Sequence, residues 1–392
     1  YYAAYYEEKM GEDEAAKKSL EKAESCAFDY CFPNKLDDIA VLTFAIENGC
    51  KKKAPYYLGN LFYDKLQWKK SVELWEMSEK ADDTFSIVHR NLALAYYNKM
   101  GDSKAAKREL EKAFSLNRKD ARIFLELDQL YKKLGYSFKE RLAKYDEDPS
   151  LAESRDDLYI EYITLMNMCG EYERAYRCIM GRRFHPWEGG EGKITTQYTI
   201  SLLEMAKQCL ASEKYEQAEK LLKKALVYPE NLGEGKLEGT KDNHLFYHLG
   251  LALEAQGKHD EAKTCFETAT IGTDEPAGAM YYNDQPADMI LYQGIAFEKL
   301  GKTREAKSRF YRLIDYGEQH LNDEGKIEYF AVSLPDFLIF DEDYTKKNRA
   351  HCCYLMALGN IGLQNREKAA EFLNEALEIE PSHMMATLYQ KQ

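Results

Sequence analysis

Apolar residues recur along this chain at the spacing of amphipathic helices. In the segment 213–228, one stripe is formed by Ala218, Leu221, Leu222 and Ala225, while Lys and Glu occupy most of the other positions. Apolar residues three and four positions apart lie on one face of a helix, so this pattern predicts a helix with one buried side. Such a helix gains most of its stability when its apolar stripe packs against another element.

The stripes are organised in a longer repeat. One copy has the spacing L-G-x2-L-x3-G-x4-A-x3-F-x2-A, and its residues are Leu249, Gly250, Leu253, Gly257, Ala262, Phe266 and Ala269. Similar copies start near Ala3, Leu58, Leu92, Phe124, Ile163, Ala206 and Gly294, and a last copy ends at Pro381. The spacing resembles the tetratricopeptide repeat, a helix-turn-helix unit of about 34 residues in which small residues let the two helices touch.

About nine such copies predict an all-α fold, a right-handed solenoid of paired helices that spans residues 1–392 as one domain. The copy at 92–113 carries one additional residue before its turn, and the pattern is weakest near 136–157. The first copy starts inside its first helix and the chain does not begin with Met. We therefore expect this sequence to be a fragment of a longer protein.

Long intervals interrupt the repeats at 181–196, 229–243, 272–286 and 314–349. Connections between helices normally need about 2–8 residues, so these intervals are unusual. The tetrad Gly-Glu-Gly-Lys occurs twice, at 190–193 and at 233–236. Because equivalent loops of consecutive repeats stack along one edge of a solenoid, we expect the two tetrads to lie within about 15 Å of each other.

Four strings in these intervals carry a closer resemblance. They are RRFHPWEGGEGK (182–193), YPENLGEGKL (228–237), YYNDQPADMILYQG (281–294) and YFAVSLPDFLIFDED (329–343). They resemble strings of large bacterial tetratricopeptide proteins that carry an upstream domain of unknown function. This resemblance implies an N-terminal domain outside the present chain, of a β-rich, sugar-mutarotase type, and through it a connection to carbohydrates. It implies no activity.

Composition and charge exclude several classes of protein. The chain has 54 basic and 67 acidic side chains and a net charge of -13, which opposes binding to phosphate backbones, so we expect no nucleic-acid partner. The best uncharged apolar run, Ile39–Ile46, is far shorter than the roughly 18 residues that a bilayer needs, so we expect no membrane span. Nine cysteines without a C-x-x-C pair favour a reducing compartment, and we expect a cytoplasmic protein.

The long intervals hold the main candidate binding residues. Trp187 offers a flat face to a sugar or a peptide ring. Polar and aromatic side chains that could line a shared pocket are His185, Glu188, Glu191, Lys193, Glu230, Asn231, Glu234, Lys236, Tyr282, Asn283, Asp284 and Gln285. The alternative is that the glycines only shape the loops and Trp187 is a hydrophobic plug. A phosphate-binding loop is not expected, because Ile194 follows Lys193 where that motif needs Ser or Thr.

A second set of candidates lies on the predicted first helices of the repeats and would line their groove: Asn60, Arg90, Asn91, Arg122, His244 and His248. Asn60, Asn91 and Arg122 occupy positions resembling those with which one class of tetratricopeptide domain clamps a peptide's C-terminal carboxylate. Tyr56 and Glu126 replace two basic members of that clamp, and Glu126 would repel a carboxylate.

The histidine pair and the abundant acidic side chains do not indicate an active site. His244 and His248 share a helix face at a metal-compatible spacing, but no third ligand is evident, so we expect a packed or groove-lining pair and no metal. No nucleophile and base stand out as a pair, and Asp and Glu on amphipathic helices usually form the solvated face. We therefore expect neither catalysis nor a cofactor.

These observations predict a non-catalytic interaction scaffold. Its partner would be a protein or peptide, or the chain's own N-terminal domain, bound along the concave groove and the stacked loops. The alternative is an accessory part of a carbohydrate-binding or carbohydrate-cleaving protein, in which the stacked loops complete a site for an oligosaccharide. A scaffold needs Trp187 buried and its carboxylates in caps or ion pairs, whereas a sugar site needs these side chains exposed and convergent.

Overall fold

The computed structural model describes residues 1–185, 187, 189–278, 285–325 and 339–391. Throughout these residues the regular secondary structure is helical, which confirms the predicted all-α fold. The helices fall into two compact units. The first unit contains Tyr1–Leu134 and Ile339–Asp341, and the second contains Gly135–Leu338 and Glu342–Gln392. One uninterrupted array over the whole chain stays a prediction.

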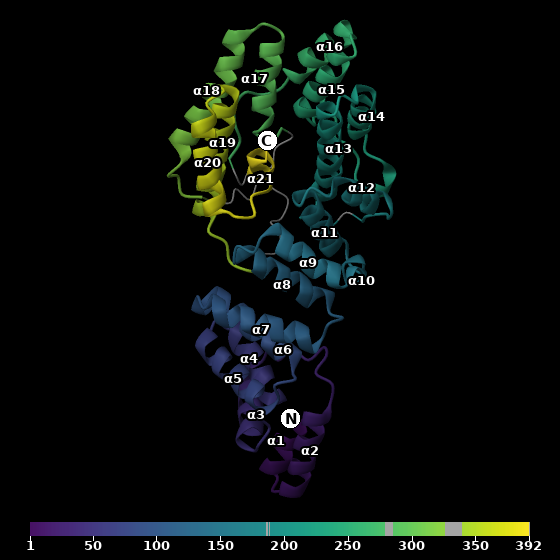
Figure 1. The fold of residues 1–392 in the computed structure, drawn as a ribbon. Coiled ribbons are helices and arrows are strands. Elements are labelled where there is room, and N and C mark those ends of the chain that lie inside the picture. The colour runs from purple at the N-terminus through teal and green to yellow at the C-terminus, as the bar shows by residue number, and fades with distance from the viewer. Residues whose placement is uncertain (186, 188, 279–284, 326–338, 392) are drawn as a thin grey trace. The chain divides into compact units, whose positions relative to one another are not determined.

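The first unit is built from eight α-helices and one π-helix (Figure 1). They are α1 (Tyr2–Lys9), α2 (Asp13–Ser25), α3 (Leu36–Glu47), α4 (Lys53–Asp64), α5 (Trp68–Ala81), α6 (Ser86–Ala95), the π-helix η1 (Tyr96–Met100), α7 (Ser103–Leu116) and α8 (Ala121–Lys133). The helix pairs α1 with α2, α4 with α5 and α6 with α7 pack closely.

A glycine explains how such a pair closes. A Cβ atom at Gly59 on α4 would lie 2.5 Å from the Nε1 atom of Trp75 on α5, so only glycine lets the indole pack against this helix. The indole Nε1–H donates to the carbonyl oxygen of Tyr56 at 3.2 Å and to the amide oxygen of Asn60 at 3.1 Å. The small residue of the repeat therefore has the steric role that its spacing predicts.

The additional residue in the repeat at 92–113 also has a structural explanation. Helix α6 ends in η1, whose π-type turns contain more residues than an α-helical turn. Gly101 then takes a left-handed conformation, with φ at 68°, and the chain turns into α7. The insertion is thus absorbed within the first helix of the pair.

The second unit contains thirteen described α-helices and one short 3-10 helix. They are α9 (Phe138–Glu147), α10 (Pro149–Glu153), α11 (Asp156–Met168), α12 (Tyr172–Met180), α13 (Lys193–Ala211), α14 (Tyr215–Ala225), the 3-10 helix η2 (Glu230–Leu232), α15 (Asn243–Ala255), α16 (His259–Ala269), α17 (Met289–Lys299), α18 (Thr303–His320), α19 (Tyr344–Gly362), α20 (Arg366–Ile379) and α21 (Met384–Gln390). Helices α18 and α19 extend into the interval 314–349, so the connection between them is shorter than the sequence pattern indicates.

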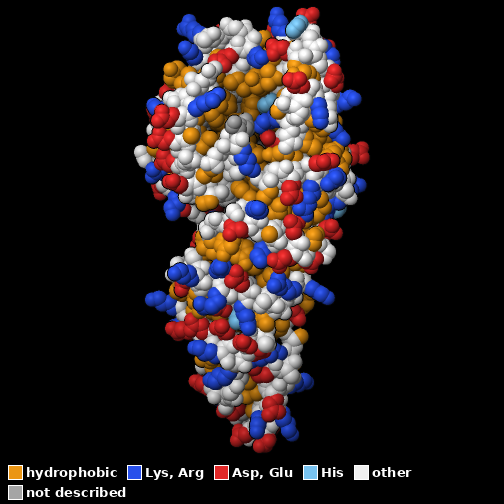
Figure 2. All heavy atoms as spheres, viewed as in Figure 1, with side chains coloured by type: hydrophobic (Ala, Val, Ile, Leu, Met, Phe, Trp, Pro, Cys, Tyr) orange, Lys and Arg blue, Asp and Glu red, His pale blue; other side chains and the backbone are white. Residues whose placement is uncertain are grey.

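Five helix pairs follow one another in this unit, from α11 with α12 to α19 with α20. The first helices of the pairs, α11, α13, α15, α17 and α19, each contact the next, so they form one continuous inner layer. Figure 2 shows hydrophobic side chains gathered towards the middle of this unit. The described part of the chain contains no helix that is both long and apolar enough to cross a membrane.

Candidate functional site

The two Gly-Glu-Gly-Lys tetrads lie side by side in the second unit. The backbone N–H of Gly192 in the first tetrad donates to the Oε2 atom of Glu234 in the second, at 2.8 Å. Gly192 and Gly233 both have left-handed backbone conformations, with φ of 75° and 74°. Burial raises the pKa of Glu234, and the Gly192 hydrogen bond partly opposes this shift. The expected proximity of the tetrads is confirmed.

Asn231 links the same two loops. Its side-chain Nδ2 donates to the carbonyl oxygens of Ile179 at 2.8 Å and Arg182 at 2.9 Å. The backbone carbonyl oxygen of Asn231 accepts a hydrogen bond from the backbone N–H of Phe184 at 2.8 Å. Asn231 therefore holds the end of α12 and the loop after it, so most of its hydrogen-bonding capacity is used within the protein.

Trp187 is half-buried and lies three residues before the first tetrad. The backbone N–H of Gly190 donates to the Trp187 carbonyl at 2.9 Å, and a Cβ atom at Gly190 would lie only 2.2 Å from the indole ring. Lys193, at the beginning of α13, places its Nζ atom 5.8 Å from the ring centroid. The loop thus holds the indole in one place with part of its surface open to solvent.

Most other loop candidates have partners within the protein. His185 is 78% exposed at its side chain, yet its backbone N–H donates to Asp156 at 2.8 Å. Glu191 accepts the Gly189 N–H at 2.8 Å. Gln285 is buried, and it exchanges two hydrogen bonds with the Thr273 backbone, at 2.9 and 2.7 Å.

Two of the charged candidates differ in their surroundings. Lys236 pairs with Asp242 at 2.6 Å and donates to the Leu226 carbonyl at 3.0 Å, while its Nζ atom lies 5.0 Å from the ring centroid of Tyr228. Glu230, in η2, is exposed. The remaining candidates Glu188, Tyr282, Asn283 and Asp284 lie outside the described residues.

The groove candidates of the first unit form a connected polar chain across α4, α6 and α8. Arg90 makes two parallel hydrogen bonds to the buried carboxylate of Glu126, at 2.7 and 2.5 Å. Arg122 donates to the same carboxylate at 3.1 Å. Asn91 donates to Asn60 at 3.0 Å. The protein's own carboxylate therefore occupies the arginines that a peptide carboxylate would need.

The histidine pair of the second unit lies beside aromatic rings, with His248 buried and His244 half-buried. The Nδ1 atom of His248 lies 2.7 Å from the His244 carbonyl oxygen, and both imidazole rings lie 5.8 Å from the Tyr292 ring. Burial lowers the pKa of His244 to about 3 and of His248 to about 4. Both rings are thus uncharged at neutral pH, in agreement with a packed, groove-lining pair.

The C-terminal helix α21 lies against the inner layer of the second unit (Figure 1). Tyr389 places its hydroxyl oxygen 2.9 Å from that of Tyr292 on α17. Leu388 packs with Met168 on α11 and Ile200 on α13. The pattern of the sequence did not reveal this placement, because seven residues give too short a period to predict where a helix docks.

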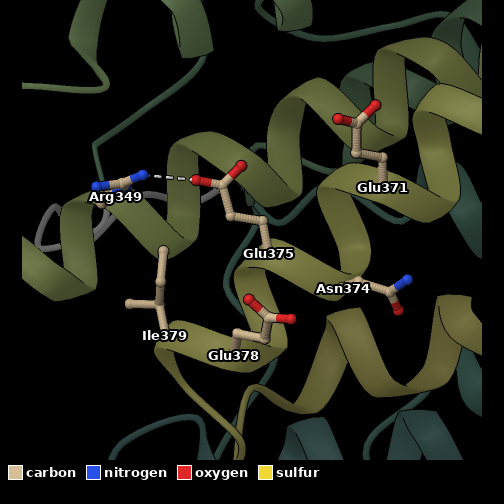
Figure 3. Close-up of a pocket in the computed structure, with 6 residues that line it drawn as sticks. All are labelled: Arg349, Glu371, Asn374, Glu375, Glu378 and Ile379. Carbon is tan, nitrogen blue, oxygen red and sulfur yellow. Dashed lines mark hydrogen bonds and ion pairs between the residues drawn. The ribbon is translucent and has the colours of Figure 1, made fainter.

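One pocket lies along α20, with Arg349 of α19 at its edge (Figure 3). Its lining residues are Arg349, Glu371, Asn374, Glu375, Glu378 and Ile379. Arg349 pairs with Glu375 at 2.7 Å, which leaves an acidic surface around one neutralised carboxylate. Its carboxylates face solvent on an amphipathic helix, as the sequence pattern predicts for such residues.

Family models of the tetratricopeptide repeat match four segments of the chain. One model matches residues 91–120, 244–270 and 350–383, and a second matches residues 288–316. These segments correspond to α6 with α7, α15 with α16, α19 with α20, and α17 with α18. The chain carries tetratricopeptide repeats. The tetratricopeptide pattern inferred from residue spacing is thereby confirmed.

Several solved structures were also matched to this chain. A tetratricopeptide repeat protein from Parabacteroides merdae is 14% identical, with 78% of this chain and 97% of that chain covered and a TM-score of 0.38. YrrB, described as a tetratricopeptide protein with an unusual peptide-binding site, is 18% identical, with 66% and 100% covered and a TM-score of 0.23. The Naa15/Naa10 complex bound to HypK contains a chain that is 13% identical, with 96% and 53% covered and a TM-score of 0.36. At these identities and TM-scores, the similarities carry no conclusion about function.

Proposed function

We propose that this chain is a non-catalytic scaffold that binds a protein or peptide through the inner helix layer of its second unit. The observation that carries the proposal is the position of α21. This short helix packs on α11, α13 and α17, three first helices from different repeats. The inner layer is therefore a surface that accepts a helix by burying its apolar side chains.

The chemistry of α21 indicates the kind of segment that would bind. Ala386, Leu388 and Tyr389 are its buried residues, so it presents one small, one aliphatic and one aromatic side chain. Met384 adds a flexible contact, since its sulfur lies 3.6 Å from the Gln197 amide nitrogen on α13. A partner helix with this pattern could come from another protein or from the proposed upstream domain of the same protein.

A chain that ends at Glu380 tests the proposal directly. We expect a labelled peptide of residues 381–391 to bind this shortened chain in a fluorescence anisotropy titration and to bind the full chain much more weakly. A peptide with Leu388→Ala and Tyr389→Ala is the matched control, and it should lose most of the affinity. Circular dichroism establishes that the shortened chain is folded.

Two results would speak against the proposal. One is a folded shortened chain that does not bind the peptide. The other is equal binding of the peptide and its double-alanine control. Should the shortened chain unfold, the full chain with Leu388→Ala takes its place, because weaker docking of α21 should make that variant bind the added peptide better than the wild type does.

A sugar site on the tetrad edge remains the second hypothesis, and the half-exposed ring of Trp187 is the feature that favours it. The loop candidates Asn231, Glu234 and Lys236 are already bonded within the protein. A ligand there would rely on the indole face and on few free polar groups. Intrinsic Trp fluorescence during titration with oligosaccharides tests this hypothesis separately from the peptide experiment.

A further inference from the structure

Three metal-ligating side chains meet in the first unit, away from the surfaces discussed above. They are Glu79 on α5, His89 on α6 and Glu109 on α7. The Nδ1 atom of His89 lies 2.8 Å from one oxygen of Glu109 and 3.8 Å from one oxygen of Glu79. All three ligand atoms lie within 4.8 Å of one another. Because three different helices supply them, helix packing sets this geometry.

The imidazole ring of His89 is oriented by its other nitrogen. The Nε2 atom lies 2.8 Å from the Asp83 carbonyl oxygen, which can only accept a hydrogen bond, so Nε2 carries a hydrogen. Nδ1 faces the carboxylates of Glu79 and Glu109. It carries a proton when the imidazole is charged and a lone pair when the imidazole is neutral. A proton there bonds Glu109 alone, because the 3.8 Å to Glu79 is too long for a hydrogen bond.

A divalent cation would use all three side chains at once. Zinc binds imidazole nitrogen and carboxylate oxygen at about 2.0–2.2 Å, which places neighbouring tetrahedral ligand atoms roughly 3.4 Å apart. The observed separations of 2.8 and 3.8 Å lie on either side of this value. The third separation, between the Glu79 and Glu109 oxygens, is at most 4.8 Å, so side-chain adjustments on the order of an ångström would bring the three ligand atoms to it.

The surroundings of the cluster match those of protein metal sites. Metal-bound histidines commonly donate their second N–H to a backbone carbonyl, as His89 does to Asp83. Metal-bound carboxylates are commonly held by a hydrogen bond at their other oxygen. Arg108 donates to Oε1 of Glu109 at 2.8 Å, and Oε2 is the oxygen that faces His89. The Glu79 side chain is 30% exposed, whereas that of His89 is 2% exposed, so a cation would enter along Glu79.

We propose that Glu79, His89 and Glu109 form a binding site for a divalent first-row transition metal ion, with zinc as the ion that fits best. The ligand set of one imidazole and two carboxylates suits zinc by donor type. A fourth ligand would be water on the exposed side. Binding would replace the proton between His89 and Glu109, and it would join α5, α6 and α7 through one ion.

The experiment uses the complete, tag-free chain after treatment with a chelator. We expect titration calorimetry with zinc chloride to show one site that Glu79→Gln weakens by about 100-fold or more, because one of three protein ligands is lost. Glu79 stands outside the His89–Glu109 hydrogen bond, so this variant should keep its fold. Glu219→Gln, an acidic ion-pair residue on α14 of the second unit, is the matched control and should bind zinc as the wild type does.

A second measurement determines which side chains bind the metal ion. Cobalt in place of zinc should give visible absorption bands of a four-coordinate ion in the wild type and in Glu219→Gln, and these bands should be lost in Glu79→Gln and His89→Gln. Zinc affinity that Glu79→Gln leaves unchanged would assign the metal to other side chains and overturn the proposal. Absence of zinc binding would show that His89 and Glu109 form only an ion pair.

Discussion

The two units place polar side chains along their first helices in different ways. Between α6 and α8 of the first unit the contact is charged, because Arg90 and Arg122 both bind the buried carboxylate of Glu126. Between α11 and α13 of the second unit it is neutral, since Asn167 donates to Gln197 at 3.0 Å and accepts from Ser201 at 2.8 Å. Both arrangements join consecutive repeats through buried hydrogen bonds.

The difference indicates which unit is suited to accept a partner. A buried ion pair is strongly desolvated, and removing one partner is costly. In the first unit Arg90 and Arg122 are therefore already engaged by Glu126 and are poorly suited to bind a partner. The inner layer of the second unit has aromatic and uncharged groups, including Tyr292 and the neutral His248, and it already holds α21. Where the inner layer presents aromatic and uncharged side chains, it can exchange one helix for another at lower cost.

The largest expected effect separates the two units by removing one large ring from each. Phe310 is fully buried against α17, and Trp75 is buried against α4. We expect Phe310→Ala to lower the stability of the second unit by about 3–5 kcal/mol, and Trp75→Ala to lower that of the first by a similar amount. Urea unfolding followed by the three tryptophans can assign each change, because Trp68 and Trp75 lie in the first unit and Trp187 in the second.

A Trp187→Phe background sharpens this measurement, since the remaining fluorescence then reports the first unit alone. In that background Phe310→Ala should leave the fluorescence transition almost unchanged while the helix signal of the second unit is lost earlier. A shift of both transitions by the same amount would mean that the two units unfold as one cooperative body. Separate unfolding free energies could then not be assigned to the two units.

Much of the fold could be predicted from the sequence because the residues at fixed positions of the repeat contact each other directly. The glycine at the eighth repeat position is followed sixteen residues later by a large ring, and the structure shows the two touching at Gly59 with Trp75 and at Gly294 with Phe310. The tetrad proximity was predictable for the same reason, since stacked repeats bring equivalent loops together. Both contacts follow from the regular spacing of the repeats along the chain.

The inner surface and the metal-ligand cluster were not predictable in this way. Glu79, His89 and Glu109 stand 10 and 20 positions apart, a spacing that matches no short ligand motif, and only the packing of three helices brings them together. Glu126 was expected to repel a peptide carboxylate, but its pairing with Arg90 depends on a contact 36 residues away. The docking of α21 likewise depends on contacts with helices far away in the sequence, such as that of Tyr389 with Tyr292, 97 residues away.

The second expected effect concerns the charged contact of the first unit. Glu126→Gln leaves the guanidinium of Arg90 beside a neutral amide with one oxygen, so we expect a loss of about 3 kcal/mol in the stability of this unit. Thermal unfolding in the Trp187→Phe background measures it. Glu371→Gln, an exposed acid on α20, is the control and should change stability by less than about 0.5 kcal/mol. Equal effects of the two substitutions would show that the Arg90 contact adds nothing beyond a surface charge.

The third prediction uses pH to examine three titratable groups in the inner layer of the second unit, Asp288, His244 and His248. Burial raises the pKa of Asp288 to about 6, so between roughly pH 4 and 6 the folded unit keeps a proton that the unfolded chain has released. This group therefore lowers stability as the pH rises through that range. The lowered pKa values of His244 and His248 act in the opposite direction, since the unfolded chain protonates these rings below about pH 6.5.

Asp288→Asn separates these opposing contributions. The variant removes the buried carboxylate, so we expect it to be about 2 kcal/mol more stable than the wild type at pH 7.5 and no more stable at pH 4. Urea titrations at both pH values measure the difference. Should the stability gain be the same at pH 4 and pH 7.5, the charge of Asp288 would not be its cause.

The smallest expected effect concerns Trp187, which lies on the loop edge and outside the inner layer. Because the indole is only half-buried and rests on Gly190, Trp187→Ala should cost about 1–2 kcal/mol, less than the removal of a fully buried ring. Trp187→Phe should recover most of this loss, because a smaller ring still covers the glycine. If the inner layer is the binding surface, Trp187→Ala should leave the affinity for the α21 peptide within about twofold of the parent chain's value. A large loss of peptide affinity with intact stability would instead place the partner on the tetrad edge, and it would reverse the assignment of function to the inner layer.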